Sequence, residues 1–557
     1  KGPSAAALYG FRGKDGVIII NTKKGTKNKR GYTIDVNNST QWNGGFIALP
    51  KYQDDYGAGE YGKYAFGDGK GGGVNDYDYD IWGPKLDGRL LPQYDGEYDA
   101  NTTYTTTFED GTSFDGHIKP TAWTARGKNN LKRFLQTGIL NSTSVALSSS
   151  TEKADMRFSM GNTYQKGIVP NTQLNNFNAS ASIGYKFTKR FSISTYVNYS
   201  RQSTPNIPDV NYGPNSIIYN MILWGGADWS VDDMRNYWQP GKVGIQQKYA
   251  EYYRYNNPWF MSYEWLRGHY VNNINGYAAL NYNVNSNIDL TLRPSITTYN
   301  FTNTEKLPYS ATVYDRPEHK GDYRVDNRSL FESNVEFQAK YHRNAILGFL
   351  DVQGMVGGNS RSFRFNSEFT TTNYLNVPGV YAFSNSLNSV QASSYNAEML
   401  VLSGYYSLDL GYKSYVTANI TGRFDKSSTL PAQNNTYFYP SFNLATVISD
   451  YAKMPKGISF LKVRGSFASS KSGGTATSFA PNVSNLAGGG YGYTYYSPYD
   501  GPGYDFSQTY TLQPYYSNQN SAAYTNTLVG NNIRTGERKA YEAGLDVRFL
   551  ETGLTWM

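Results

Sequence analysis

A cluster of tryptophans and carboxylates has the clearest potential for binding chemistry in this sequence. Five of the nine tryptophans lie between residues 224 and 265, with acidic residues among them. Aromatic rings pack on the apolar faces of sugar rings or on peptide side chains, and carboxylates accept hydrogen bonds from hydroxyl groups. The candidate ligand-binding residues are Trp224, Trp229, Trp238, Trp259, Trp265, Asp228, Asp232 and Asp233. Three other interpretations stay open: an aromatic belt at a membrane interface, packing inside a folded loop, and an interface with a partner protein.

Three acidic residues form a weaker candidate for a metal site. Asp76, Asp78 and Asp80 offer the hard oxygen ligands that Ca²⁺ prefers, although a flexible acidic loop is the favoured interpretation. The histidines His117, His269, His319 and His342 are scattered along the chain, and there is no cysteine. Thiol catalysis, thiolate zinc sites and disulfides are therefore excluded, and no metal or cofactor is predicted.

The sequence carries no signature of an enzyme or of a nucleic-acid-binding protein. It contains no H-E-x-x-H, G-x-S-x-G or G-x-x-x-x-G-K-[ST] motif. The formal net charge is +8, but the only dense basic run, at residues 23–30, has no aromatic residues interleaved with it. We therefore expect neither catalysis nor a nucleic-acid partner.

Apolar and polar residues alternate with a period of two, which predicts β-strands. Residues 177–187 alternate without a break, and the pattern resumes after a turn at 188–190. Similar hairpins surround turns at 285–287 and 411–413, and all three turns are expected at one end of the sheet. No stretch approaches the roughly 18 consecutive apolar residues of a membrane-spanning helix, so a helical membrane protein is excluded.

The alternation also assigns residues to two faces of the sheet. The positions expected to face lipid include Ala179, Ala181, Ile183, Leu280, Tyr282, Leu290 and Phe337. The positions expected to face a polar lumen are Lys186, Asn281, Glu336 and Gln338.

Connection lengths favour a transmembrane barrel over a soluble β-sandwich. Short turns alternate with long segments, which we place near 44–139, 201–271, 301–327, 362–394, 426–439 and 470–539. Outer-membrane barrels have short turns at one end and long extracellular loops at the other. The pattern contains about fifteen strands, whereas bacterial barrels close with an even number. The expected fold is therefore all-β, a transmembrane antiparallel β-barrel that is partial in this chain.

Several motifs resemble one transporter family when taken in order. Residues 4–25 (SAAALYGFRGKDGVIIINTKKG) are followed by LPKYQ at 49–53, WGPKLDG at 82–88, FLQTG at 134–138 and YQKGIV at 164–169. NVPGVY at 376–381, TGRFD at 421–425, YPS at 439–441 and YEAGLD at 541–546 complete the set. Together they resemble the SusC/RagA group of TonB-dependent outer-membrane transporters of Bacteroidetes. The segment 530–539 departs from the pattern that is common in this family.

The resemblance implies an architecture and partners. Residues 1–30 would be the C-terminal end of a plug domain and residues 31–557 the barrel, without most of the plug or the last strands. It further implies location in the outer membrane of a Gram-negative bacterium, contact with outer-membrane lipid, energy from the TonB-ExbB-ExbD complex and a SusD-like surface lipoprotein as a lid.

Two functions remain open at this point. The first is import of oligomeric nutrients, either oligosaccharide or peptide fragments, without covalent chemistry. The alternative is a soluble or surface-attached β-rich carbohydrate-binding protein or glycosidase. A retaining glycosidase needs two carboxyl groups about 5 Å apart, and no feature of the sequence pairs them.

Overall fold

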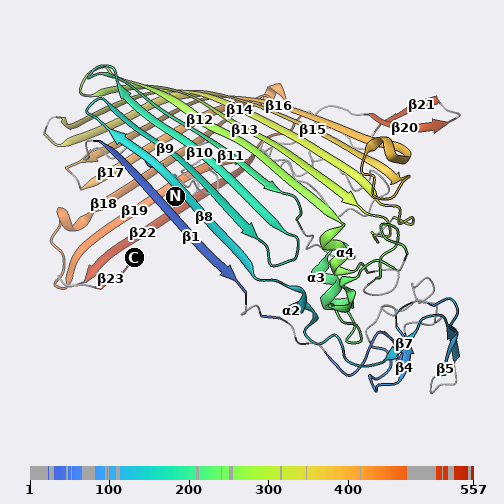
Figure 1. The fold of residues 1–557 in the computed structure, drawn as a ribbon. Coiled ribbons are helices and arrows are strands. Elements are labelled where there is room, and N and C mark those ends of the chain that lie inside the picture. Colours follow the sequence, from blue (N-terminus) through green and yellow to red (C-terminus); the bar gives the residue numbers. More distant parts are fainter. Residues whose placement is uncertain are drawn as a thin grey trace.

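A single curved antiparallel sheet of 15 strands dominates the structure, in the order β1-β8-β9-β10-β11-β12-β13-β14-β15-β16-β17-β18-β19-β22-β23 (Figure 1). The computed structural model describes residues 10, 23, 31–44, 48–49, 51, 53–64, 82–93, 97, 99–107, 113–207, 213–239, 241–249, 255–313, 316–346, 348–413, 415–472, 510–516, 519–524, 532–549 and 554–556. The all-β prediction is confirmed, and the large sheet has the predicted number of strands, with further short strands in the connections. Within these residues, no pairing joins β1 to β23.

The strands of the sheet lengthen toward its middle. They are β1 (Tyr32–Asn43), β8 (Gly138–Ser150), β9 (Ala154–Lys166), β10 (Gln173–Lys186), β11 (Phe191–Thr204), β12 (Leu266–Asn283), β13 (Ile288–Leu307), β14 (Asp322–Ile346), β15 (Leu350–Leu375), β16 (Ser386–Tyr412), β17 (Val416–Ser427), β18 (Thr436–Val447), β19 (Ile458–Ser472), β22 (Gly536–Phe549) and β23 (Leu554–Trp556).

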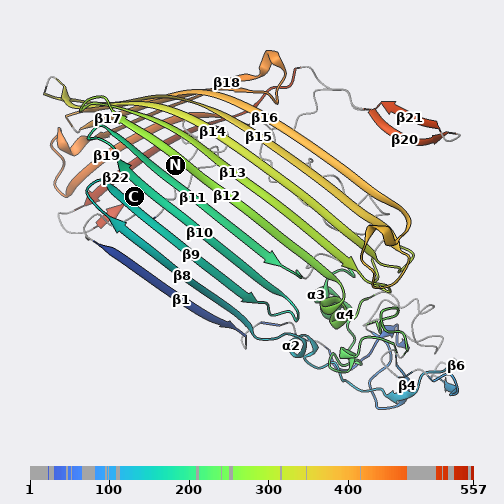
Figure 2. The same ribbon diagram turned by 45° about the horizontal axis from the view of Figure 1, so that its top comes forward.

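Strands that follow each other in the sheet's sequence order pair as antiparallel neighbours. Successive connections therefore lie at alternating ends of the sheet. Figures 1 and 2 show the short turns at one end and the helical connections at the other. The three predicted turns join β10 to β11, β12 to β13 and β16 to β17, so they lie at the same end, as predicted. The third turn is displaced: Gly411 and Tyr412 still belong to β16, and the turn begins at Lys413, whose φ is 47°.

Two of the predicted long connections are much shorter than expected. The segment 362–394 is mostly strand, and only residues 376–385 connect β15 to β16. Likewise, residues 308–321 connect β13 to β14, in place of the predicted 301–327. The other four connections, 44–137, 205–265, 428–435 and 473–535, start or end a few residues from the predicted bounds.

The error at 362–394 has a physical reason. β15 has 26 residues, which span roughly 85 Å, whereas a transmembrane strand needs only about 9–11. In its second half the alternation is inverted: Phe363, Phe365 and Phe369 are buried on the lumen face, while Arg364 and Glu368 point outward. A pattern that reverses its sense indicates that the second half of this strand lies outside the belt that is predicted to face lipid.

The register places the two predicted sets of residues on opposite faces. Leu280 pairs with Leu292, which pairs with Phe337, and residues directly opposite each other share a face. The neighbouring row joins Asn281, Thr291 and Gln338. Separate apolar and polar faces are therefore confirmed, whereas contact of the apolar face with lipid stays a prediction.

Smaller elements fill the long connections. They are β2 (Gly59–Glu60), β3 (Lys63–Tyr64), β4 (Leu90–Pro92), β5 (Tyr104–Thr107), β6 (Ser113–Gly116), β7 (Pro120–Ala122), α2 (Asn130–Phe134), α3 (Ile217–Tyr219), η2 (Asn220–Trp224), η3 (Asp233–Arg235), α4 (Pro258–Tyr263), η4 (Phe383–Asn385), η5 (Ala432–Asn434), η6 (Ile448–Asp450), β20 (Tyr510–Tyr516) and β21 (Gln519–Tyr524). None of the helices in the described part of the chain has the length and apolar content needed to cross a membrane.

Candidate functional site: the loop cap and the lumen wall

Connections at the long-loop end fold together into one unit, which we call the loop cap and define as residues 53–64, 82–93, 113–137, 167–172, 213–239, 241–249, 255–265 and 308–313. Its apolar core combines Phe134 from the β1–β8 connection, Val169 from β9–β10, Trp229 from β11–β12 and Val313 from β13–β14. The cap is therefore held by contacts between segments far apart in sequence.

The candidate residue Asp228 makes hydrogen bonds that connect two segments of the cap. Its side chain is fully buried, and Oδ1 accepts a hydrogen bond of 2.8 Å from the backbone N–H of Ala58. Arg126 donates through Nε to the backbone carbonyl of Asp228 at 2.7 Å. These bonds join the first long connection to the β11–β12 connection, which gives Asp228 a structural role in the cap.

Asn130 also connects the first long connection to the β11–β12 connection by hydrogen bonds, a role that the sequence did not suggest. Its Nδ2 donates to the carbonyl of Trp229 at 3.0 Å, and its Oδ1 accepts from the N–H of Val231 at 2.9 Å. A single side-chain amide thus satisfies both a backbone donor and a backbone acceptor of the β11–β12 connection. Only the tertiary contact reveals this role, because a lone Asn at the start of a short helix has many other uses.

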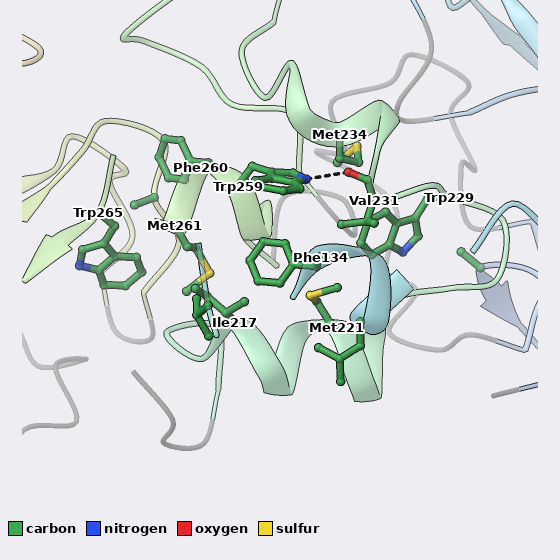
Figure 3. Packing of buried hydrophobic residues seen from close by; sticks show 14 of the residues in the cluster. Phe134, Ile217, Met221, Trp229, Val231, Met234, Trp259, Phe260, Met261 and Trp265 are labelled. Atoms are coloured by element: carbon green, nitrogen blue, oxygen red, sulfur yellow. Dashed lines mark hydrogen bonds between the residues drawn. The ribbon is translucent and has the colours of Figure 1, made fainter. Parts of the chain in front are cut away.

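Three of the five candidate tryptophans lie in the apolar core of the cap (Figure 3). The exposed fractions of Trp229, Trp259 and Trp265 are 0%, 6% and 2%. Trp259 donates through Nε1 to the carbonyl of Val231 at 2.6 Å, and Trp265 donates to Oε1 of Glu305 at 2.8 Å. Their positions agree with the alternative of packing inside a folded loop.

The other candidates are less buried. Trp224 is half-buried and stacks on Tyr255 with ring centroids 5.1 Å apart, and Trp238 is half-buried against Phe260. Asp232 is exposed and pairs with Arg133 at 3.0 Å. Asp233 is exposed 3.8 Å from Arg126. Ligand contact at these four residues stays a prediction.

The weaker metal candidates cannot be placed, because Asp76, Asp78 and Asp80 lie outside the described residues. Elsewhere in the described ranges, no group of three or more His, Asp or Glu side chains is arranged to hold a metal ion.

Two ionisable groups of the cap are shifted by their surroundings. Burial raises the pKa of Tyr237 well above its usual value, and the hydrogen bond of 2.8 Å from its hydroxyl to Glu264 acts in the same direction. Tyr237 therefore stays a hydrogen-bond donor at any physiological pH. The hydrogen bond from Arg89 lowers the pKa of Asp87 to about 2.

The lumen wall, defined here as the inward face of β12–β19 and β22, buries several ion pairs beside the phenylalanines of β15. Glu305 contacts Arg267 at 3.0 Å and Arg324 at 3.4 Å. Two residues further along β14, Arg328 pairs with Asp326 at 2.8 Å, and both side chains are 2% exposed. Opposite charges thus alternate along the face that looks into the curved sheet.

Toward the short-turn end the lumen wall is hollowed, and charged and amide side chains line part of the hollow. A cavity of about 1040 Å³ lies there, and its lining includes Asp351, Asp409, Asn419, Arg464 and Glu542. A wall of this kind keeps hydrophilic groups solvated, which a barrel that passes polar solutes requires.

Comparisons with known proteins agree with this architecture. No family profile matches the chain. The TonB-dependent receptor P3 of Formosa agariphila is 22% identical over 465 residues, which cover 80% of this chain and 38% of the receptor. The structure of the RagAB peptide transporter matches with a TM-score of 0.66 and 14% identity over 99% of this chain and 56% of that chain. RagAB in the open-open state matches with a TM-score of 0.65 and 14% identity over 98% of this chain and 55% of that chain.

These matches define the class of fold. The chain has the barrel fold of RagA, and the resemblance to SusC/RagA-type TonB-dependent transporters that the sequence predicts is confirmed. The chain spans about half the length of the RagA chains and 38% of the curated receptor.

Proposed function

We propose that this chain is part of a TonB-dependent importer in the outer membrane of a Gram-negative bacterium, which takes up oligomeric nutrients. The observation that carries the proposal is the pairing of a folded loop cap with a polar lumen wall in a RagA-type fold. The cap offers a surface for capture at one end of the sheet, and the wall offers a hydrophilic path. No step requires covalent chemistry.

The cargo and partners belong to this proposal. One matched structure is described as a peptide transporter, which favours peptide fragments over oligosaccharides. A SusD-like lipoprotein would close over the loop cap, and the TonB-ExbB-ExbD complex would supply energy. Residues 1–30 would be the end of a plug and residues 31–557 the barrel.

Uptake by cells tests the function. Cells with the intact gene and cells without it are given fluorescent peptide pools and, separately, labelled oligosaccharides. We expect uptake of one class only with the intact gene, and its loss when a protonophore removes the inner-membrane proton gradient. Equal uptake of both classes by both strains would contradict import.

Ligand contact at the half-buried tryptophans is the finer part of the proposal. Trp238→Ala should weaken cargo binding, because it removes an aromatic face beside Asp232 and Asp233 in the sequence. Trp82→Ala is the matched control, since Trp82 is 56% exposed and stacks on Tyr56 elsewhere in the cap. Equal loss of binding in both variants would show that the β11–β12 connection is not the specific ligand-binding site.

A further inference from the structure

Gly10 is buried, and the atoms nearest to a Cβ added at this position belong to β17, which lies far away in the sequence. A Cβ atom added to Gly10 would lie 3.2 Å from Nε of Arg423 and 3.2 Å from Oδ2 of Asp425. Arg423 and Asp425 are alternate residues on the lumen face of β17. Gly10 therefore packs against the lumen wall at this ion pair.

That ion pair is fixed by three neighbouring strands. Arg423 donates through Nε to Oδ1 of Asp425 at 2.6 Å, and the side chains are 8% and 4% exposed. Through Nη2, Arg423 also donates to Asn359 on β15 at 3.1 Å and to Ser403 on β16 at 2.7 Å. A buried guanidinium with several partners is held in one orientation, so the surface that it presents is rigid.

Two properties of residue 10 fit this surface. Its φ is +69°, in the left-handed region that glycine adopts without steric cost. Its missing side chain leaves room for the guanidinium and the carboxylate, since real Cβ atoms seldom approach other atoms as closely as 3.2 Å. Gly379 separates the two properties, because its φ is +75° but nothing lies within 4 Å of an added Cβ.

We propose that the Arg423–Asp425 pair is a docking seat on the lumen wall for the backbone at Gly10. The seat takes a backbone position without a side chain, and its occupant is Gly10 of this same chain. The proposal gives a structural role to two motifs: TGRFD at 421–425 supplies the ion pair, and the Gly of LYG at 8–10 packs against it. The seat does not depend on which cargo is transported.

A double-mutant cycle in the full-length protein tests whether Gly10 is needed for its contact with the ion pair or only for its positive φ. Gly10→Ala should lower the thermal midpoint of the folded protein in two ways, through the positive φ and through the clash with the pair. In an Arg423→Ala, Asp425→Ala background the clash is gone, so the additional loss caused by Gly10→Ala should shrink. Gly379→Ala is the control, and its effect should be the same in both backgrounds. If Gly10→Ala is equally harmful in both backgrounds, the seat is refuted.

A crosslink provides an independent measurement, because the chain contains no cysteine. The variant Gly10→Cys with Asp425→Cys is oxidised, or bridged by a short thiol reagent, and cut at a protease site inserted in the turn at 285–287. The two fragments should remain joined on a denaturing gel. In the matched control, Gly10→Cys with Lys426→Cys, they should separate, because residue 426 points to the opposite face of β17. Equal joining in both variants, or separation in both, would overturn the proposal. Only protein that migrates as the folded form before heating is analysed.

Discussion

The loop cap and the lumen wall bury their side chains in opposite ways. The cap packs tryptophan, phenylalanine and methionine into an apolar core, as a soluble domain does. The wall buries arginine, aspartate and glutamate as ion pairs. The difference follows from surroundings: the outer face of a barrel already carries the apolar residues, so the inner face is free to be polar. The largest apolar cluster therefore lies in the connections, whereas the buried ion pairs of Arg324, Arg328 and Arg423 lie on strands, beside a smaller apolar cluster around Phe363 and Phe365.

The largest expected effect is a loss of stability when a buried ion pair of the lumen wall is broken. Asp326→Ala removes the carboxylate that pairs with Arg328 at a site where both side chains are 2% exposed. Breaking a buried pair at one partner costs about 3–5 kcal/mol, so the thermal midpoint in detergent should fall strongly. Glu398→Ala is the control, because its pair with Arg364 is exposed and is worth at most about 1 kcal/mol. Similar midpoints for the two variants would show that the wall does not depend on its ion pairs.

The next effect tests the two faces of the sheet. Ile183→Arg places a charge on the apolar face, at a cost of about 2–4 kcal/mol if that position lies at mid-membrane. Asn281→Arg places the same charge on the polar face, where water and carboxylates are available. The yield of assembled barrel, measured by heat-modifiable migration, should fall much further for the first variant. Equal yields would mean that the assignment of faces is wrong.

A smaller effect tests the cap. Asp228→Ala leaves the buried N–H of Ala58 without its acceptor, which costs about 1–3 kcal/mol. We expect faster proteolysis of the cap while the barrel keeps its folded migration. Loss of the folded barrel in this variant would show that the barrel itself depends on this contact within the cap.

The smallest effect depends on pH. Because the pKa of Asp87 is lowered from 3.8 to about 2, its interaction with Arg89 stabilises the cap above pH 3.8 and is lost as the pH falls toward 2. The side chain is 38% exposed, so solvent screening keeps the contribution below about 1 kcal/mol. Proteolysis of Asp87→Asn should be slightly faster than that of the parent at neutral pH and equal to it near pH 2. A difference that grows as the pH falls would have the wrong sign.

The strands that cross the proposed bilayer could be predicted from sequence because lipid on one side and water on the other impose a period of two. The second half of β15 could not, since Phe363 and Phe365 reverse the expected sense of the alternation. For Trp229 the sequence offered packing inside a folded loop as one interpretation but could not select it. That packing depends on contacts such as that between Asp228 and Ala58, which are 170 residues apart, and no local pattern encodes such a distance.

Spin labels on β14 test the central claim most directly, namely that one sheet separates a lipid face from a polar lumen. Single cysteines at Val335, Glu336, Phe337 and Gln338 are labelled in the otherwise cysteine-free protein, reconstituted in bilayers, and the collision rate with dissolved oxygen is measured. Oxygen concentrates in lipid, so the rate should be high at 335 and 337 and low at 336 and 338. Rates without a period of two, or with the opposite phase, would contradict the account.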